Sequence, residues 1–312
     1  MSNYRKTSPT TVIVKENAKT KAYLANVHDE ASEAAPGTSL EEASLLIKKG
    51  AIVVDVRGMA EQNGWRKIDS AVSVPRGEIE MFAVPGAEKY HKCFDNVEDQ
   101  YLLCCSSGFR AKLAGLTLSK LGFKNVRSFA LKQFASPEEL QTWAQSIGTC
   151  QKRTQKTAVA ESDRRQELME QLVKEASHIH HVRNGDFVIK LASHQKNLIL
   201  DVRESEEIEE WGKIAGSIHI PRGMLEVVAN RDSKLYMPIF DNAELPMYCY
   251  CRCGKRALLA AHTLSSMGFK AMTIGGFTQY KVLDHVQIIE PEQKAGKEED
   301  GDGNTCTICT IA

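Results

Sequence analysis

The chain carries one sequence pattern twice, and the two copies keep a constant spacing. Cys105 and Cys251 each open a short loop that ends in arginine, and they lie 146 residues apart. The same offset relates further pairs across residues 52–134 without a gap, among them Asp55 and Asp201, Pro75 and Pro221, Phe94 and Phe240, and Gly122 and Gly268. Chance does not produce such a register, so the chain contains two copies of one domain.

At 312 residues the chain has room for two domains of ordinary size, each able to bury its own core. The 40 Lys and Arg residues balance the 40 Asp and Glu residues, so the formal net charge is +0. A general nucleic-acid surface needs an excess of basic residues. We therefore expect no nucleic-acid partner, and any basic patch must be local.

No stretch of the sequence approaches the roughly 20 apolar residues that cross a bilayer. The segment Met1–Ala22 also lacks the apolar core of a signal peptide. The sequence thus predicts a cytoplasmic location and no membrane partner. The chain has 9 cysteines, an odd number. In a reducing compartment such cysteines are typical of reactive or metal-binding sites rather than of a disulfide framework.

Changes in composition divide the chain into five parts. The sequence predicts a partly disordered N-terminal arm over 1–38, a first domain over 39–148 and a linker over 149–161. It predicts a second domain over 162–290. The remaining segment, 291–312, is charged and glycine-rich and is expected to be a flexible tail with a Cys-x-x-Cys pair.

Each domain begins with signals for alternating helices and strands. Leu40–Lys49 has helical spacing, with two glutamates in its first turn and Gly50 as a stop. The apolar runs 52–54 and 198–200 are short and end at an aspartate, as buried parallel strands do. We expect another helix over 162–176, with its first serine as the N-cap. The predicted fold class is α/β, with two duplicated domains that each hold a parallel sheet flanked by helices on both faces.

Each cysteine loop lies between an apolar strand and a helix. After the loops, apolar residues recur at helical spacing until Gly122 and Gly268 end the two helices. Each cysteine is therefore expected at the carboxyl end of a strand, facing a helix N-terminus, where open α/β sheets bind ligands. The N–H groups of the helix and of the glycine-containing loop favour an anion. We expect them to lower the pKa of the Cys251 and Cys105 thiols and so to produce thiolate nucleophiles.

Both halves resemble rhodanese domains, the sulfurtransferase family whose cradle loop begins with cysteine. The resemblance rests on the Asp-Val-Arg strand ends, the run Gly212–Pro221, the Cys-x-x-Gly-x-Arg loops and the segment Gly275–Phe277. It covers nearly all of residues 39–147 and 177–290. The resemblance implies that a donor gives sulfane sulfur to the thiolate, and that a thiol or cyanide acceptor then removes it from the cysteine persulfide. It implies that no metal or organic cofactor is needed.

The first copy departs from the family pattern in two places. Lys67–Ala71 lacks both glycines of the matching segment, and Phe129 and Ala130 stand where the second copy has Gly275 and Gly276. Four residues separate the cysteine from the arginine in both loops, whereas the related phosphatase-type loop is one residue longer. By resemblance, the shorter loop suits a single sulfur atom rather than a tetrahedral oxyanion. The loop length therefore argues against a tyrosine phosphatase or an arsenate reductase.

The two loops differ in charge, and the difference suggests different donors. The second loop carries three cations, which favour a dianion such as thiosulfate, whereas the first carries one and favours a less charged donor, a protein or a small thiol. The candidate catalytic residues are Cys251 and Cys105. The arginine after each Pro-ended strand is expected to reach the rim of the pocket. The candidate substrate-binding residues are Arg252, Cys253, Gly254, Lys255, Arg256 and Arg222 in the second copy, and Ser106, Ser107, Gly108, Phe109, Arg110 and Arg76 in the first.

Other residues near the loops have simpler interpretations or open alternatives. Cys104 and Cys249 lie on the strands before the loops and are expected in the core. Cys253 is either a thiol that attacks the persulfide and leaves a disulfide, or a spectator. The spacing of the cysteines around Cys251 is unusual for zinc. The strand-end aspartates are expected to bond nearby backbone rather than to act as general bases.

The principal function predicted is a thiosulfate sulfurtransferase, with a small anionic sulfur donor and a thiol or protein acceptor as partners. A mercaptopyruvate or polysulfide sulfurtransferase is an alternative. A non-enzymatic alternative is a persulfide carrier or regulatory module. In the tail, Cys306 and Cys309 have the spacing of a redox dithiol and are either a mobile relay or an inert pair.

Overall fold

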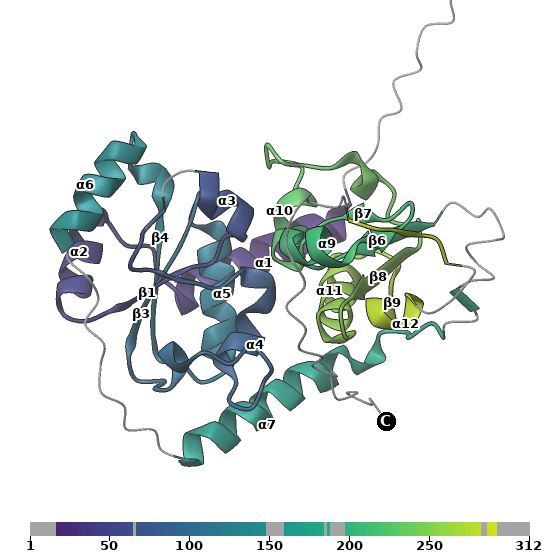
Figure 1. Ribbon diagram of the computed structural model, residues 1–312, viewed down its shortest axis with the longest axis horizontal. Coiled ribbons are helices and arrows are strands. Elements are labelled where there is room, and N and C mark those ends of the chain that lie inside the picture. The colour runs from purple at the N-terminus through teal and green to yellow at the C-terminus, as the bar shows by residue number, and fades with distance from the viewer. Residues whose placement is uncertain are drawn as a thin grey trace, which may run out of the picture.

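Two α/β domains lie side by side in the computed structural model, the first on the left of Figure 1 and the second on the right. No helix in the part of the chain that the structure describes is both long enough and apolar enough to cross a membrane. The described residues are 17–64, 67–147, 159–183, 186–187, 197–281 and 286–291.

The first domain is built on a four-stranded parallel sheet with the order β2-β1-β3-β4. Val53 and Val54 of β1 enter different apolar clusters, because successive side chains of a strand point to opposite faces of the sheet. The sheet is therefore buried on both faces, as a parallel sheet requires. The strands are β1 (Ile52–Asp55), β2 (Val72–Ser73), β3 (Gln100–Cys105) and β4 (Asn125–Ala130).

Helices cover both faces of this sheet. Helices α2 and α6 pack on one face, and α4 and α5 pack on the other. The helix predicted over 40–49 and the strand predicted over 52–54 are both confirmed. The helices are α2 (Leu40–Lys48), α3 (Met59–Gly64), α4 (Ile79–Ala83), α5 (Phe109–Lys120) and α6 (Pro137–Ile147).

The second domain repeats this arrangement, with a parallel sheet in the order β7-β5-β8-β9. Helices α10 and α11 pack on one face and α12 on the other. The strands are β5 (Leu198–Asp201), β7 (Ile218–His219), β8 (Met247–Cys251) and β9 (Ala271–Gly276), with a separate antiparallel pair of β6 (Lys213–Ile214) and β10 (Ile288–Ile289). The helices are α9 (Ser205–Trp211), α10 (Leu225–Val228), α11 (Lys255–Ser266) and α12 (Phe277–Tyr280).

Short 3-10 helices connect several of these elements. Two of them, η1 and η5, follow β2 and β7 and lie at equivalent positions of the repeat. The 3-10 helices are η1 (Arg76–Glu78), η2 (Lys92–Phe94), η3 (Leu131–Gln133), η4 (Ala176–His178), η5 (Arg222–Met224) and η6 (Pro238–Asp241).

The N-terminal segment contains a helix that the sequence did not reveal. α1 (Ala18–Ala34) lies between the domains and packs on both α5 and α11. Its Thr20 hydroxyl donates a hydrogen bond to the Met267 carbonyl of the second domain at 2.9 Å. Only Thr20 and Ala31 of this helix are buried, so it lacks the broad apolar stripe by which a helix is recognised. The arm predicted over 1–38 as partly disordered therefore contains an ordered helix, and residues 1–16 lie outside the described ranges.

The helix predicted over 162–176 is present as α7 (Val159–Glu175), which runs along the lower side of Figure 1. Because α7 begins at Val159, Ser162 lies inside the helix and is not its N-cap. Leu168 and Leu172 pack against the core of the first domain, and Arg165 donates a hydrogen bond to the Ala83 carbonyl at 2.9 Å. The predicted second domain, which begins at residue 162, thus starts with a helix that packs on the core of the first domain and also contacts α11.

Two reciprocal ion pairs join the domains. Arg76 Nη2 lies 2.5 Å from Glu226 Oε1, and Arg222 Nη2 lies 2.6 Å from Glu80 Oε1. All four side chains are at least nine-tenths buried. The sequence predicts Arg76 and Arg222 at the rim of the cysteine loops. That expectation is wrong, because both guanidinium groups bind buried carboxylates at the domain interface.

Candidate active sites

Cys251 is the last residue of β8, and its loop leads directly into α11. Gly254 has a φ of +95°, a left-handed conformation that glycine adopts without strain. This turn aims the Gly254 N–H at the sulfur, with the nitrogen 3.1 Å from Cys251 Sγ. The Cys251 side chain is 0% exposed. The predicted position of Cys251, at a strand end facing a helix N-terminus, is confirmed.

Cys105 has the same surroundings in the first domain. Gly108 has a φ of +92°, and its N–H donates a hydrogen bond to Cys105 Sγ at 3.1 Å. Cys105 is also 0% exposed. The side chains of Ser106 and Ser107 are exposed, and Phe109 is half-buried. The cradle geometry is therefore present in both domains.

The strand beside each loop differs between the domains. β9 shifts its register against β8 immediately before Cys251, whereas β4 pairs regularly with β3 and places Ala130 opposite Cys105. A Cβ on Gly276 would lie only 2.5 Å from the Arg252 carbonyl oxygen. The second loop therefore needs glycine at this position, and the first loop holds the same hydrogen bond to its sulfur with alanine there.

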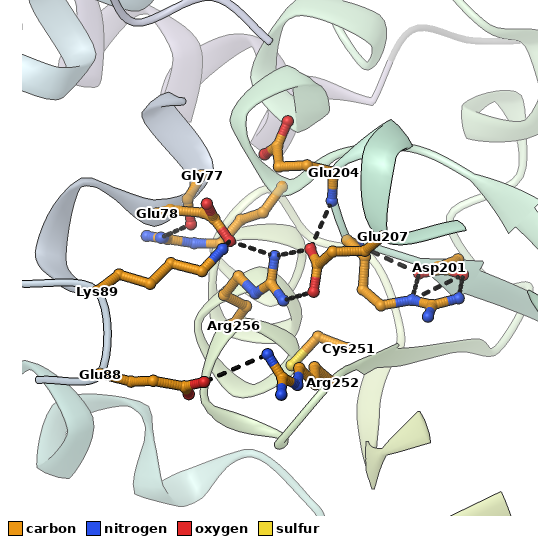
Figure 2. A network of polar contacts seen from close by, with 12 residues as sticks. Gly77, Glu78, Glu88, Lys89, Asp201, Glu204, Glu207, Cys251, Arg252 and Arg256 are labelled. Carbon is orange, nitrogen blue, oxygen red and sulfur yellow. Dashed lines mark hydrogen bonds and ion pairs between the residues drawn. The ribbon is translucent and has the colours of Figure 1, made fainter. Parts of the chain in front are cut away.

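The arginine that ends each loop is bound by a glutamate of its own domain. Arg110 Nη1 and Nη2 lie 2.5 and 2.7 Å from the Glu61 carboxylate, and both Nη atoms of Arg256 lie 2.5 Å from the Glu207 carboxylate. Figure 2 shows the second of these pairs. These guanidinium groups, which were expected to bind the donor, instead hold each loop against a neighbouring helix. Glu61 and Glu207 are related by the repeat offset, so the repeat contained a signal for them that the sequence analysis missed.

The second loop has an additional support from the first domain. Glu78 Oε1 accepts hydrogen bonds from Arg256 Nη1 at 2.7 Å and from Lys89 Nζ at 2.6 Å (Figure 2). The side chains of Arg256 and Glu78 are only 3% and 4% exposed. The residue that corresponds to Glu78 in the second domain is Met224. The first loop therefore receives no carboxylate from the equivalent position.

Arg252 also contacts the first domain. Its Nη1 lies 3.2 Å from Glu88 Oε1, and its guanidinium carbon lies 5.3 Å from the centre of the Trp211 ring. An anionic donor that binds the Arg252 guanidinium group must therefore bind it beside the Glu88 carboxylate. Lys255 and Cys253 are exposed on the same loop. Of the three cations that the sequence placed at this site, Lys255 is the one whose side chain is exposed.

In the second loop the thiols of Cys251 and Cys253, two residues apart, interact and shift each other's pKa. Burial raises the pKa of the Cys251 thiol well above its usual value, so the expected lowering is wrong for this residue. The hydrogen bond from Cys251, helped by the charges of Arg256 and Lys255, lowers the pKa of the Cys253 thiol to about 6. At neutral pH the pair therefore carries one negative charge, held mainly by Cys253.

Glu204 places a further carboxyl group at the domain interface, above the Arg256 network in Figure 2. A Cβ on Gly77 of the first domain would lie 2.9 Å from Glu204 Oε1. The residue is 6% exposed. Burial, together with the negative charge of Glu78, raises the pKa of the Glu204 carboxyl to about 8. This carboxyl group is therefore largely protonated at neutral pH.

A cavity of about 640 Å³ lies beside the first loop, between the two domains and α1. Ser107 and Phe109 of the loop line it, together with His28 of α1 and Arg231 and Tyr236 of the second domain. The His28 and Phe109 rings stack with their centres 6.0 Å apart. The volume is typical of sites for small molecules. The first loop therefore borders a cavity with mixed aromatic and polar walls.

The remaining predicted residues have structural roles or lie outside the described ranges. Cys104 and Cys249 are fully buried in the core, as predicted, and burial raises the pKa of Cys249 to about 12. The tail residues Cys306 and Cys309 are not among the described residues. Within the described ranges no group of three or more His, Cys, Asp or Glu side chains is placed to hold a metal ion. Each strand-end aspartate accepts a hydrogen bond from the backbone N–H of the arginine two residues later and forms a buried ion pair with it: Asp55 with Arg57, and Asp201 with Arg203.

Comparison with known families agrees with this geometry. The family model described as "Rhodanese-like domain" matches residues 39–130 and 186–282, which together make up more than half of the chain. Each matched segment contains one cysteine loop. The chain therefore belongs to the rhodanese-like family and holds two such domains in tandem, and the predicted resemblance and fold class are confirmed.

Individual relatives match only one domain's length of this chain. The putative sulfur carrier protein YrkF of Bacillus subtilis (strain 168) is 38% identical over 95 residues, which cover 30% of this chain and 46% of YrkF. Thiosulfate sulfurtransferase/rhodanese-like domain-containing protein 3 of Mus musculus is 31% identical over 97 residues, which cover 30% of this chain and 62% of that protein. The chain thus spans less than two thirds of either relative.

One solved structure matches both domains together. The crystal structure of thiosulfate sulfurtransferase from Pseudomonas aeruginosa has a TM-score of 0.57 and covers 93% of this chain and 51% of that one. The sequence identity is 18%, so the likeness concerns the fold.

Proposed function

We propose that this chain is a sulfurtransferase in which Cys251 takes sulfane sulfur from an anionic donor such as thiosulfate and holds it as a persulfide. A thiol or cyanide acceptor then removes the sulfur. The observation that carries the proposal is the Cys251 cradle, in which a buried sulfur at a strand end faces the Gly254 N–H at 3.1 Å. Preorganised N–H groups of this kind stabilise negative charge that develops on a reacting group.

The transfer requires two displacements at sulfur. In the first, Cys251 Sγ attacks the outer sulfur of thiosulfate, and sulfite leaves with the electron pair of the broken S–S bond. Cys251 gives up its proton to solvent before the attack. In the second, the acceptor attacks the outer sulfur of the persulfide, and Cys251 leaves as the thiolate. The exposed Lys255 attracts the anionic donor to this loop.

For the first domain we propose that Cys105 carries sulfur from a less charged donor, an organic or protein thiol derivative. The neighbouring cavity of about 640 Å³ supports this assignment, because aromatic side chains such as Phe109 and Tyr236 contribute to its lining. The loop itself carries only Arg110 as a cation, and that side chain is bound to Glu61.

The test is turnover with thiosulfate and cyanide, combined with the intact mass of the protein after incubation with thiosulfate alone. Cys251→Ser should lower thiosulfate turnover by about a hundredfold, because the covalent nucleophile is lost. Cys105→Ser is the matched control, since its cradle has the same geometry. If the Cys251→Ser protein keeps most of its rate, Cys251 is not the nucleophile.

The same experiment separates the alternatives. Persulfide formation in proportion to protein, without turnover, would favour a persulfide carrier, and one relative is described as a putative sulfur carrier protein. Turnover with 3-mercaptopyruvate or polysulfide, but not with thiosulfate, would favour the other sulfurtransferase reactions. A double change of Arg252 and Lys255 to serine should raise the apparent KM for thiosulfate more than it lowers kcat.

A further inference from the structure

We propose that Cys253 is a second sulfur carrier, which receives the outer sulfur from Cys251 and delivers it to bulky thiol acceptors at the mouth of the loop. This inference rests on the proposed sulfurtransferase function. It assigns the loop two cysteines with separate tasks: Cys251 accepts sulfur from the small donor, and Cys253 presents it outside.

The difference in exposure between the two cysteines motivates the proposal. Cys251 is 0% exposed, whereas Cys253 is exposed. A small anion such as cyanide can enter the cradle, but the thiol of a protein cannot reach a sulfur atom held below the loop surface. Sulfur carried on Cys253 is accessible to such a thiol.

The placement of the two cysteines makes the step feasible. Cys251 and Cys253 are two residues apart on the short loop between β8 and α11, so an outer sulfur on Cys251 that points toward the mouth of the loop approaches Cys253. Arg252, the residue between them, extends toward Glu88 and the Trp211 ring. The exposed Lys255 remains on the loop to attract an anionic persulfide.

The transfer conserves atoms and electrons without a further reactant. The Cys253 thiolate attacks the outer sulfur of the protonated persulfide on Cys251, and a new S–S bond forms at Cys253. The bond between Cys251 Sγ and the outer sulfur breaks, and its electron pair stays on Cys251. The proton of the outer sulfur passes to Cys251, which becomes a thiol again. The negative charge therefore stays at the exposed end of the loop, where water solvates it, and moves only from Cys253 Sγ to the outer sulfur.

The first domain supplies a natural comparison. Ser107 occupies the position that corresponds to Cys253, and it is also exposed. A hydroxyl group cannot accept sulfane sulfur by this exchange, so the first loop lacks the second carrier. Cys253→Ser therefore gives the second loop the residue that the first loop already has, in a cradle of the same geometry.

The experiment loads the full chain with thiosulfate, quenches it with an alkylating reagent and maps the added sulfur by peptide mass spectrometry. Trypsin cleaves after Arg252 and so separates Cys251 from Cys253. We expect the added sulfur on both cysteines in the unchanged chain, on Cys251 alone in Cys253→Ser, and on neither in Cys251→Ser. We also expect the ratio of the rate with reduced thioredoxin to the rate with cyanide to fall about tenfold or more in Cys253→Ser.

Each contrary outcome has a separate meaning. Sulfur on Cys251 alone in the unchanged chain, or an unaltered ratio of the two acceptor rates, overturns the second carrier and leaves the sulfurtransferase function in place. A disulfide between Cys251 and Cys253 with release of hydrosulfide also overturns it. If no sulfur is added to the unchanged chain by thiosulfate, the proposed function itself fails.

Discussion

Replacing Glu204 with glutamine should remove a loss of stability that the protein suffers as the pH rises. The Glu204 carboxyl group is 6% exposed and lies against the backbone of the first domain, with Glu78 nearby. Its pKa is raised from 4.5 to about 8. Glutamine keeps the shape of the protonated carboxyl group and has no proton to lose, so the substitution tests the charge alone.

The sign of the effect follows from proton linkage. The folded state holds a proton on Glu204 at pH values where the unfolded chain has released it, so folding is favoured at low pH. This contribution is complete below the unfolded pKa of 4.5 and is lost as the pH rises through the folded pKa of about 8. One pKa unit corresponds to about 1.4 kcal/mol, so the full shift of 4.5 to about 8 sets an upper bound of about 5 kcal/mol.

Urea unfolding of the unchanged chain and of Glu204→Gln at several pH values measures this effect. The variant should gain stability relative to the unchanged chain by about 3 kcal/mol between about pH 5.5 and about pH 7.5. Glu210→Gln is the control, because Glu210 is exposed on α9, the helix whose N-cap is Glu204. A constant difference between the two proteins across this range would refute the argument that Glu204 is protonated in the folded state.

Three further predictions concern the loops and the interface. Gly276→Ala should lower turnover and stability, because its Cβ would lie 2.5 Å from a carbonyl oxygen of the second loop. Gly37→Ala is the control and should change neither, since its Cβ would have nothing within 4 Å. Equal effects of the two substitutions would contradict the steric argument. Thiolate absorbance should follow the ionisation of Cys253 at about pH 6 in the unchanged chain, and its midpoint should move to higher pH in Cys251→Ala, which removes the hydrogen-bond donor. Arg222→Met should destabilise the protein by about 3 kcal/mol or more in urea unfolding, since it leaves a buried carboxylate unpaired; a change below about 1 kcal/mol would show that water reaches that carboxylate.

The repeat made the fold and the positions of both loop cysteines predictable. Short apolar runs that end at aspartate identified β1 and β5, and the glycines after the loops identified the ends of α5 and α11. These features depend on local sequence, which both copies share. The helix α1 was not predictable in the same way, because it is held between two domains and only Thr20 and Ala31 of its residues are buried.

Contacts between the domains escaped prediction for a different reason. Several of these contacts use residues at positions where the two copies differ. A comparison of the two copies therefore does not reveal which residues bind each other across the interface. Glu78 corresponds to Met224, and Glu204 corresponds to Gly58. The raised pKa of Cys251 could not be predicted from the sequence either. The loop sequence shows the groups that favour a thiolate, but it does not show how deeply the sulfur is buried.

The reciprocal ion pairs between the domains have the form of an isologous interface, the kind that joins identical subunits about a two-fold axis. Arg76 and Arg222 correspond in the repeat, as do Glu80 and Glu226, so each half offers the other the same groups that it receives. Joining both halves in one chain makes their association intramolecular and independent of protein concentration. It also allows each half to diverge while the other keeps its partner. Glu78 is present in one half alone and supports only the loop of the other half. In a homodimer both subunits would carry this glutamate, so both cysteine loops would receive it.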